Sequence, residues 1–190
     1  MLLLVTFLVE GGLFLMGLLL TGGWNAKLWS EFNISWVSTV YALLLCLPML
    51  VMLFFAVRSK WAPLSYLKNE LDEKITPIFA QCKFLDLVVI ALLAGLGEEL
   101  FFRGWLQRAL ENRFGIWVGI LIASAIFGFG HYLSTTYAVY AGLTGLYLGV
   151  IYQVSGNLFI VITIHALYDF IALMYLAGRD RKTELHEGVI

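Results

Sequence analysis

The stretch that decides the fold is an apolar segment carrying two adjacent carboxylates and a guanidinium, Gly97-Glu98-Glu99-Leu100-Phe101-Phe102-Arg103-Gly104-Trp105-Leu106-Gln107. An ionisable side chain at mid-bilayer costs at least about 2.5–3.5 kcal/mol on insertion scales, so such a residue usually faces a protein interior or a wet cavity and has a function. On a helix, Glu99 and Arg103 are four residues apart and can pair on one face. Glu98 points about 100° away from Glu99 and is free for another task.

The composition of the chain is that of an integral membrane protein. Of its 190 residues, 61% are hydrophobic and 13% are charged, whereas ordinary globular domains are about 45–50% apolar and about 25% charged. A water-soluble core cannot absorb so much apolar surface at this length, so we predict an all-α membrane protein with one transmembrane domain, residues 1–190. The net charge of −1 and the lack of a basic stripe argue against a nucleic-acid partner. Cys46 and Cys82 are isolated and predict neither a disulfide nor a cysteine metal site.

Six apolar runs predict a bundle of about six transmembrane helices. They cover residues 2–20, 34–57, 84–115, 116–131, 137–154 and 157–177. In the first run, Glu10 has no partner nearby in sequence, and we expect it to be a polar group satisfied inside the bundle. The polar stretch 58–83 has leucines and isoleucines at three-to-four spacing, which predicts an amphipathic helix on the membrane surface until Pro77 interrupts it.

The distribution of basic residues predicts a multi-pass protein of the cell membrane with both termini in the cytoplasm. With six spans and a cytoplasmic N-terminus, the inner segments carry Arg58, Lys60, Lys68, Lys74, Lys83, Arg179, Arg181 and Lys182, against Lys27, Arg108 and Arg113 outside. The polar residues 178–190 are expected to form a mobile cytoplasmic tail.

Three further polar side chains lie in apolar helices. His131 follows Phe127-Gly128-Phe129-Gly130, and His165 and Asp169 are four residues apart on one helix face. A glutamate can act as a general base or bind a metal, a histidine can polarise water or bind a metal, and a pair of groups can stabilise an oxyanion. The set suits hydrolysis of an unreactive bond by an activated water. It contains no convincing nucleophile, because Ser124 and Ser134 have no defined histidine partner in sequence and neither cysteine neighbours the motifs.

These motifs resemble those of the CPBP family of intramembrane proteases. The resemblance rests on Glu98-Glu99-x-x-x-Arg103, Phe127-x-x-x-His131 and His165-x-x-x-Asp169, in this order on three hydrophobic helices. The family includes the type II CAAX prenyl endopeptidases and the bacterial Abi proteins linked to bacteriocin processing and immunity. The resemblance covers residues 84–177, the motif-bearing catalytic core, and the glycine-bearing segment between the later motifs of the family corresponds to Gly145 and Gly149.

The resemblance implies a role for each motif residue. Glu98 would activate water together with His131, Arg103 would hold Glu99 to shape the site, and His165 with Asp169 would stabilise the oxyanion. Family members carry Asn or Asp at the last position, and an ionised Asp169 can only accept hydrogen bonds. Asp169 would then orient His165, be protonated, or bind a metal.

The resemblance leaves the cofactor open. We favour a metal-free site, with zinc or another divalent ion as the alternative; its ligands would be Glu98, His131, His165 and Asp169.

The sequence therefore predicts an intramembrane endopeptidase of the CAAX/Abi type. Its partners would be the lipid bilayer and a membrane-associated protein or peptide, prenylated or not, which it would cut with a water activated by glutamate and histidine. The alternative is a non-catalytic bacteriocin-immunity or binding protein on the same scaffold. A proton- or ion-coupled carrier is disfavoured because the sequence shows no inverted repeat. The substrate and the oligomeric state are left open.

Overall fold

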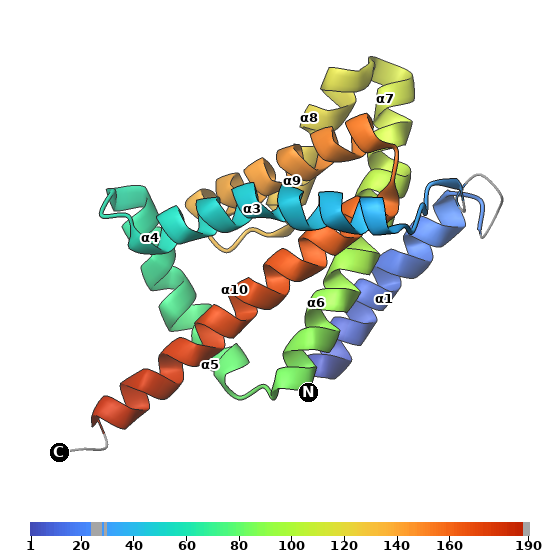
Figure 1. The fold of residues 1–190 in the computed structure, drawn as a ribbon. Helices are drawn as coiled ribbons and strands as arrows, with labels where there is room; N and C mark the ends of the chain where they lie inside the picture. The colour runs from blue at the N-terminus through green and yellow to red at the C-terminus, as the bar shows by residue number, and fades with distance from the viewer. Residues whose placement is uncertain (24–27, 29, 188–190) are drawn as a thin grey trace.

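The computed structural model describes residues 1–23, 28 and 30–187, with side chains described as far as Arg179, and it builds them from helices (Figure 1). The described part of the chain contains no β-strand. In chain order the elements are α1 Leu2–Leu20, α3 Trp36–Arg58, α4 Ala62–Glu70, the π-helix η1 Leu71–Ile75, α5 Thr76–Ala80, α6 Phe84–Glu99, the π-helix η2 Leu100–Gln107, α7 Arg108–Phe114, α8 Ile116–Gly130, α9 Thr135–Ser155 and α10 Leu158–Glu187.

The all-α membrane class is confirmed, but fewer helices meet the length for a span than the six predicted. Among the described residues four helices are long and apolar enough: α1, α3, α9 and the Leu158–Arg179 part of α10. A fifth span exists if Ala62–Ala80 and Phe84–Phe114, which meet at a bend of 117°, count as one broken span. All six apolar runs are helical, but α8 has only 15 residues and falls short of the bilayer thickness.

Several helix ends lie where the sequence predicts them. Gly115 separates α7 from α8 with φ 86°, and Gly156 ends α9 in the left-handed region with φ 59°. Glycine adopts both conformations without the steric cost that a Cβ atom would bring. At the other end of α9, the Ser134 hydroxyl accepts a hydrogen bond from the Tyr137 amide and caps the helix.

The segment Ala62–Ala80, here called the arm, is helical throughout but changes its winding at η1. The expected amphipathic helix is present, and its apolar residues Leu67, Leu71 and Ile75 line a cavity of the bundle. An ion pair of 2.7 Å between Asp72 and Arg179 ties the arm to α10. The arm is therefore packed against the bundle as well as lying at its surface.

A close helix contact lies beside the charged segment. Helix α6 packs between α1 and α10 (Figure 1). A Cβ atom at Gly97 would overlap the carbonyl oxygen of Glu10 on α1, and one at Gly17 would lie 2.9 Å from the Phe101 amide nitrogen. Glycine at these two positions therefore lets α1 lie directly against the segment that carries Glu98 and Glu99.

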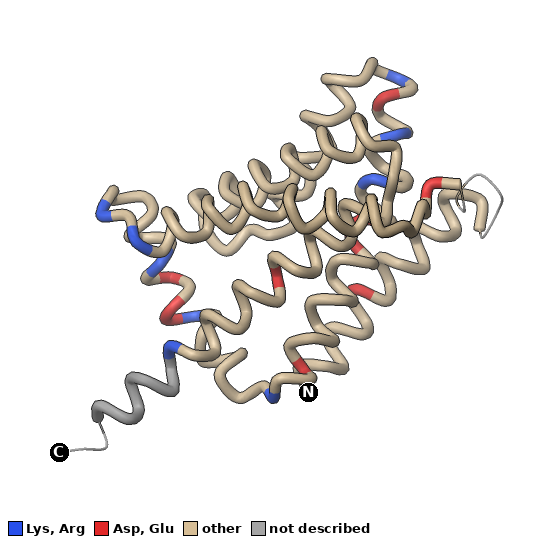
Figure 2. The backbone as a smooth tube through the Cα atoms, viewed as in Figure 1, with Lys and Arg blue, Asp and Glu red and all other residues tan. Residues whose placement is uncertain are grey.

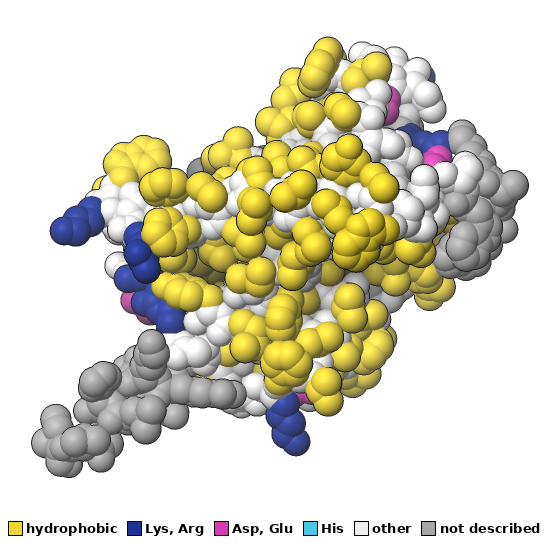
Figure 3. All heavy atoms as spheres, in the orientation of Figure 1, with side chains coloured by type: hydrophobic (Ala, Val, Ile, Leu, Met, Phe, Trp, Pro, Cys, Tyr) yellow, Lys and Arg dark blue, Asp and Glu magenta, His cyan; other side chains and the backbone are white. Residues whose placement is uncertain are grey.

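The surface separates an apolar belt from charged ends. Figure 3 shows hydrophobic side chains over most of the visible face, and Trp36 and Val154 are among the most exposed, at 81% and 83%. Lysines and arginines gather around the arm and, at the opposite end, around α7 (Figure 2). This distribution matches a bundle whose sides contact lipid and whose ends contact headgroups and water.

The C-terminal helix extends beyond its predicted end at residue 177. Helix α10 continues to Glu187, and its end lies at the same end of the bundle as the N-terminus (Figure 1). The mobility predicted for residues 178–190 stays a prediction, because the side chains from residue 180 onward lie outside the described part. The same holds for Lys27, Arg181 and Lys182, which enter the topology prediction.

Candidate active site

The ion pair expected within the charged segment is present. Arg103 Nη1 lies 2.8 Å from Glu99 Oε1, and the two side chains are 3% and 0% exposed. The second guanidinium nitrogen of Arg103 donates to the Gly145 carbonyl on α9 at 2.7 Å, and the guanidinium carbon lies 4.9 Å from the centre of the Phe127 ring. Arg103 belongs to the π-helix η2, a rare winding that often occurs at functional sites. The arginine therefore ties the segment to α9.

His165 bridges two carboxylates that come from different helices. Its Nδ1 lies 2.7 Å from Glu99 Oε1 and its Nε2 lies 3.4 Å from Asp169 Oδ2. His165 is 4% exposed, so its ring orientation is set by these partners and by the surrounding helices. His165 and Asp169 both line a cavity of the bundle. A proton on Nε2 could be donated to Asp169 or to a substrate oxygen.

Glu98 faces His131 across the boundary between α6 and the end of α8. Glu98 Oε1 lies 3.6 Å from His131 Nε2, beyond hydrogen-bond length. His131 Nδ1 lies 2.9 Å from the Phe127 carbonyl, which can only accept, so Nδ1 carries a proton; in its neutral form the ring has a lone pair on Nε2. Glu98 Oε2 is buried and has no hydrogen-bond partner among the described residues. A carboxylate and an imidazole lone pair thus converge on one small space.

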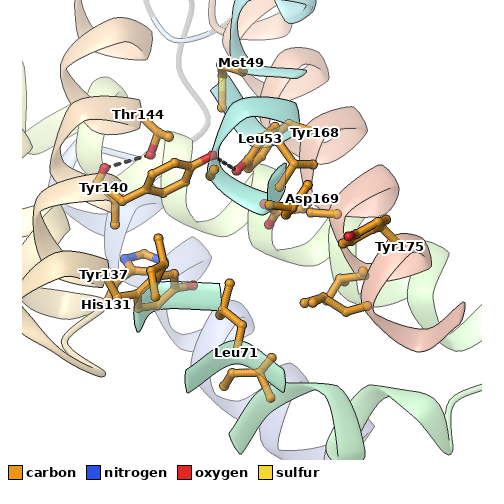
Figure 4. Close-up of a pocket in the computed structure, with 18 of the residues that line it drawn as sticks. Met49, Leu53, Leu71, His131, Tyr137, Tyr140, Thr144, Tyr168, Asp169 and Tyr175 are labelled. Atoms are coloured by element: carbon orange, nitrogen blue, oxygen red, sulfur yellow. Dashed lines mark hydrogen bonds between the residues drawn. The ribbon is translucent and has the colours of Figure 1, made fainter. Parts of the chain in front are cut away.

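A cavity of about 260 Å³ adjoins these groups (Figure 4). His131, His165 and Asp169 line it, whereas Glu98, 6% exposed, is not among the lining residues. The remaining wall comes mainly from apolar and tyrosine side chains of α3, α9, α10 and the arm. Tyr140 and Tyr168 meet at 2.9 Å between their hydroxyl oxygens on one side of the cavity.

Residues 80–171 match the family model described as "Type II CAAX prenyl endopeptidase Rce1-like". This segment is similar to the Rce1-like family. The match confirms the resemblance to CAAX-type intramembrane proteases at the level of the family, and the matched segment contains all six predicted site residues. The chain is also 27% identical over 167 residues to the uncharacterized protein YpbD of Bacillus subtilis strain 168, in a match that covers 85% of this chain and 79% of that protein. No solved structure matches the chain significantly.

The Rce1-like segment brings its predicted site residues together as two linked groups. Glu99, Arg103, His165 and Asp169 form one chain of contacts, and Glu98 with His131 forms the other. The stacking of Phe127 on His131, with ring centres 4.5 Å apart, joins the two groups through the cation–π contact to Arg103. The structure thus gives each motif residue a partner, while their roles in catalysis stay predictions.

Sequence reasoning did not identify two features of the site. The contact between His165 and Glu99 joins residues 66 positions apart, which no local spacing reveals. Glu10 on α1 interacts electrostatically with His165 and Asp169, and its Oε2 is buried without a hydrogen-bond partner among the described residues. The expectation that Glu10 is satisfied inside the bundle is therefore not met at this oxygen. The sequence signal for a role of Glu10 near the site is its position as a lone carboxylate in an apolar helix.

The described residues do not provide an arrangement suited to a metal ion. They contain no group of three or more histidine, cysteine, aspartate or glutamate side chains placed to hold one. The four candidate ligands are divided between two pairs, with Glu98 facing His131 and Asp169 facing His165. The metal-free site stays a prediction.

Proposed function

We propose that the protein is an intramembrane endopeptidase that hydrolyses a peptide bond of a membrane-associated protein or peptide. The observation that carries this proposal is the convergence of Glu98 Oε1 and His131 Nε2, 3.6 Å apart beside a cavity of the bundle. The Rce1-like match supports a protease of the CAAX type at the level of the family.

In this mechanism, water donates hydrogen bonds to Glu98 and His131, and its oxygen attacks the scissile carbonyl carbon. Glu98 takes the proton from the water as the new carbon–oxygen bond forms. The carbonyl oxygen gains negative charge, which a proton on His165 Nε2 stabilises. The carbon–nitrogen bond then breaks, and the proton held by Glu98 passes to the leaving amine.

The remaining groups hold this arrangement in place. Arg103 fixes Glu99, and Glu99 fixes the ring of His165 through its Nδ1. Asp169, beside Nε2, orients the same ring from the cavity side. Two serine hydroxyls in the region are used by the backbone: Ser124 donates to the Ile120 carbonyl, and Ser134 caps α9. This supports attack by water over attack by a serine.

The test uses purified protein reconstituted in lipid vesicles and a peptide that ends in a CAAX sequence, supplied with and without an S-farnesyl group. Mass spectrometry of the products in ¹⁸O-labelled water should show cleavage at one peptide bond, with one labelled oxygen in the new carboxyl group. Comparison of the two peptides reports whether prenylation is required. Binding of the peptide without any cleavage would contradict the proposal and favour the non-catalytic alternative.

A further inference from the structure

Lys68 is unusual among the residues that line the cavity beside the candidate active site. Among the described residues that line the cavity, it is the only lysine or arginine. It lies on α4 in the arm and is partly buried. The ionisable groups of the site, His131, His165 and Asp169, come from the end of α8 and from α10. The candidate active site and the Lys68 cation thus line the same cavity, whose other lining residues are mainly apolar.

Lys68 has no hydrogen bond or ion pair with any described residue, in contrast to two other cations at the arm. Lys74 pairs with Glu70, and Arg179 pairs with Asp72 of the arm. An ammonium group has three donors and no acceptor, and partial burial makes an anionic partner more valuable than it would be in water. The group that completes this site should therefore carry a negative charge.

We propose that Lys68 is a specificity-determining residue that binds the free C-terminal carboxylate of the substrate. This inference rests on the proposed function. The cavity has a volume of about 260 Å³ and the arm forms part of its wall through Leu67, Leu71 and Ile75. Apart from Lys68 and the groups of the candidate site, the lining consists mainly of apolar and tyrosine side chains, which suits a chain end that carries apolar side chains next to its carboxylate. Each extended residue spans about 3.3–3.6 Å, so only a short segment fits beyond the scissile bond.

The experiment compares two peptides of identical sequence, one with a free C-terminal carboxylate and one with a C-terminal amide. Each is cleaved by wild type, Lys68→Met, Lys68→Arg and the control Lys60→Met in vesicles of neutral lipid. Lys60 is an exposed cation near the start of the arm and does not line the cavity. Methionine keeps an unbranched apolar stem and removes the charge.

Wild type should cleave the free peptide with a kcat/KM about tenfold or more above that of the amide, corresponding to ~1.4 kcal/mol or more. The difference should arise in KM. Lys68→Met should lose this preference while cleaving the amide as wild type does, Lys68→Arg should keep most of it, and Lys60→Met should keep all of it.

Two results would overturn the inference. One is a wild type without preference for the free carboxylate, a result that needs no variant to fold. The other is a Lys68→Met variant that loses activity equally on both peptides, since the loss would then not depend on the substrate carboxylate; repeating the assay in vesicles that contain phosphatidylglycerol shows whether Lys68 binds a lipid headgroup instead. Cleavage of the amide by wild type would support the proposed peptidase activity even if the results contradict the role of Lys68.

Discussion

Arg103 illustrates how single contacts hold a charge inside the bundle. Its guanidinium has an ion pair to Glu99, a hydrogen bond to the Gly145 carbonyl and a cation–π contact with Phe127. These partners replace the water that the group loses on burial.

Arg103→Ala should therefore destabilise the protein as well as inactivate it. Removing one partner of a buried ion pair costs about 3–5 kcal/mol, because the other charge is left uncompensated. The fraction of protein that stays soluble on heating in detergent measures this effect. Arg113→Ala, at an exposed position of α7, is the control. Equal stability of the two variants would show that the Glu99–Arg103 pair is not needed to hold the bundle together.

Asp169→Asn tests how the oxyanion is stabilised. If Asp169 orients His165 or donates a proton, the amide can take its place, and activity should stay within about tenfold of wild type.

We expect the purified protein to be active without stoichiometric metal. Stoichiometric zinc in an active preparation, with activity lost on chelation and restored by zinc, would contradict this expectation.

At the scale of the elements, the contact between α1 and α6 controls the position of Glu98. Gly97→Ala should force the helices apart, at a cost of about 1–3 kcal/mol for overpacking, and should lower activity. Gly12→Ala is the matched control, because a Cβ there has no neighbour within 4 Å. Thermal stability and cleavage rate should fall for the first variant only. If both variants behave alike, the close contact does not position the site.

The sequence predicted those features of the elements that depend on local spacing. The pairing of Glu99 with Arg103 follows from a separation of four residues, and Gly115 and Gly156 end helices because they accept positive φ. The winding of η2 was not predictable, since its residues also suit an α-helix and tertiary packing decides between the two.

Contacts between distant elements could not be derived from spacing at all. The bond between His165 and Glu99 depends on how α10 packs against α6. The leucines of the arm predicted an apolar face, but not that this face lines a cavity. The site residues were found because ionisable groups in apolar helices are costly, and that cost gives no information on their partners.

At the scale of the whole molecule, the charged ends predict which side of the membrane each end faces. In a variant lacking Cys46 and Cys82, a cysteine at Asn69 in the arm should react with a membrane-impermeant reagent from the cytoplasmic side. A cysteine at Asn112 in α7 should react from the opposite side. Both residues are exposed. Labelling of both positions from one side would contradict the topology.

The most direct test of the account is the cleavage rate of Glu98→Gln in lipid vesicles, measured under single-turnover conditions. Glutamine keeps the shape of the side chain and removes the base, so the rate should fall by about 10²-fold or more while the protein stays folded. Glu73→Gln, at an exposed position of the arm, should cleave like wild type. Near-normal cleavage by Glu98→Gln would contradict the assignment of Glu98 as the residue that activates water.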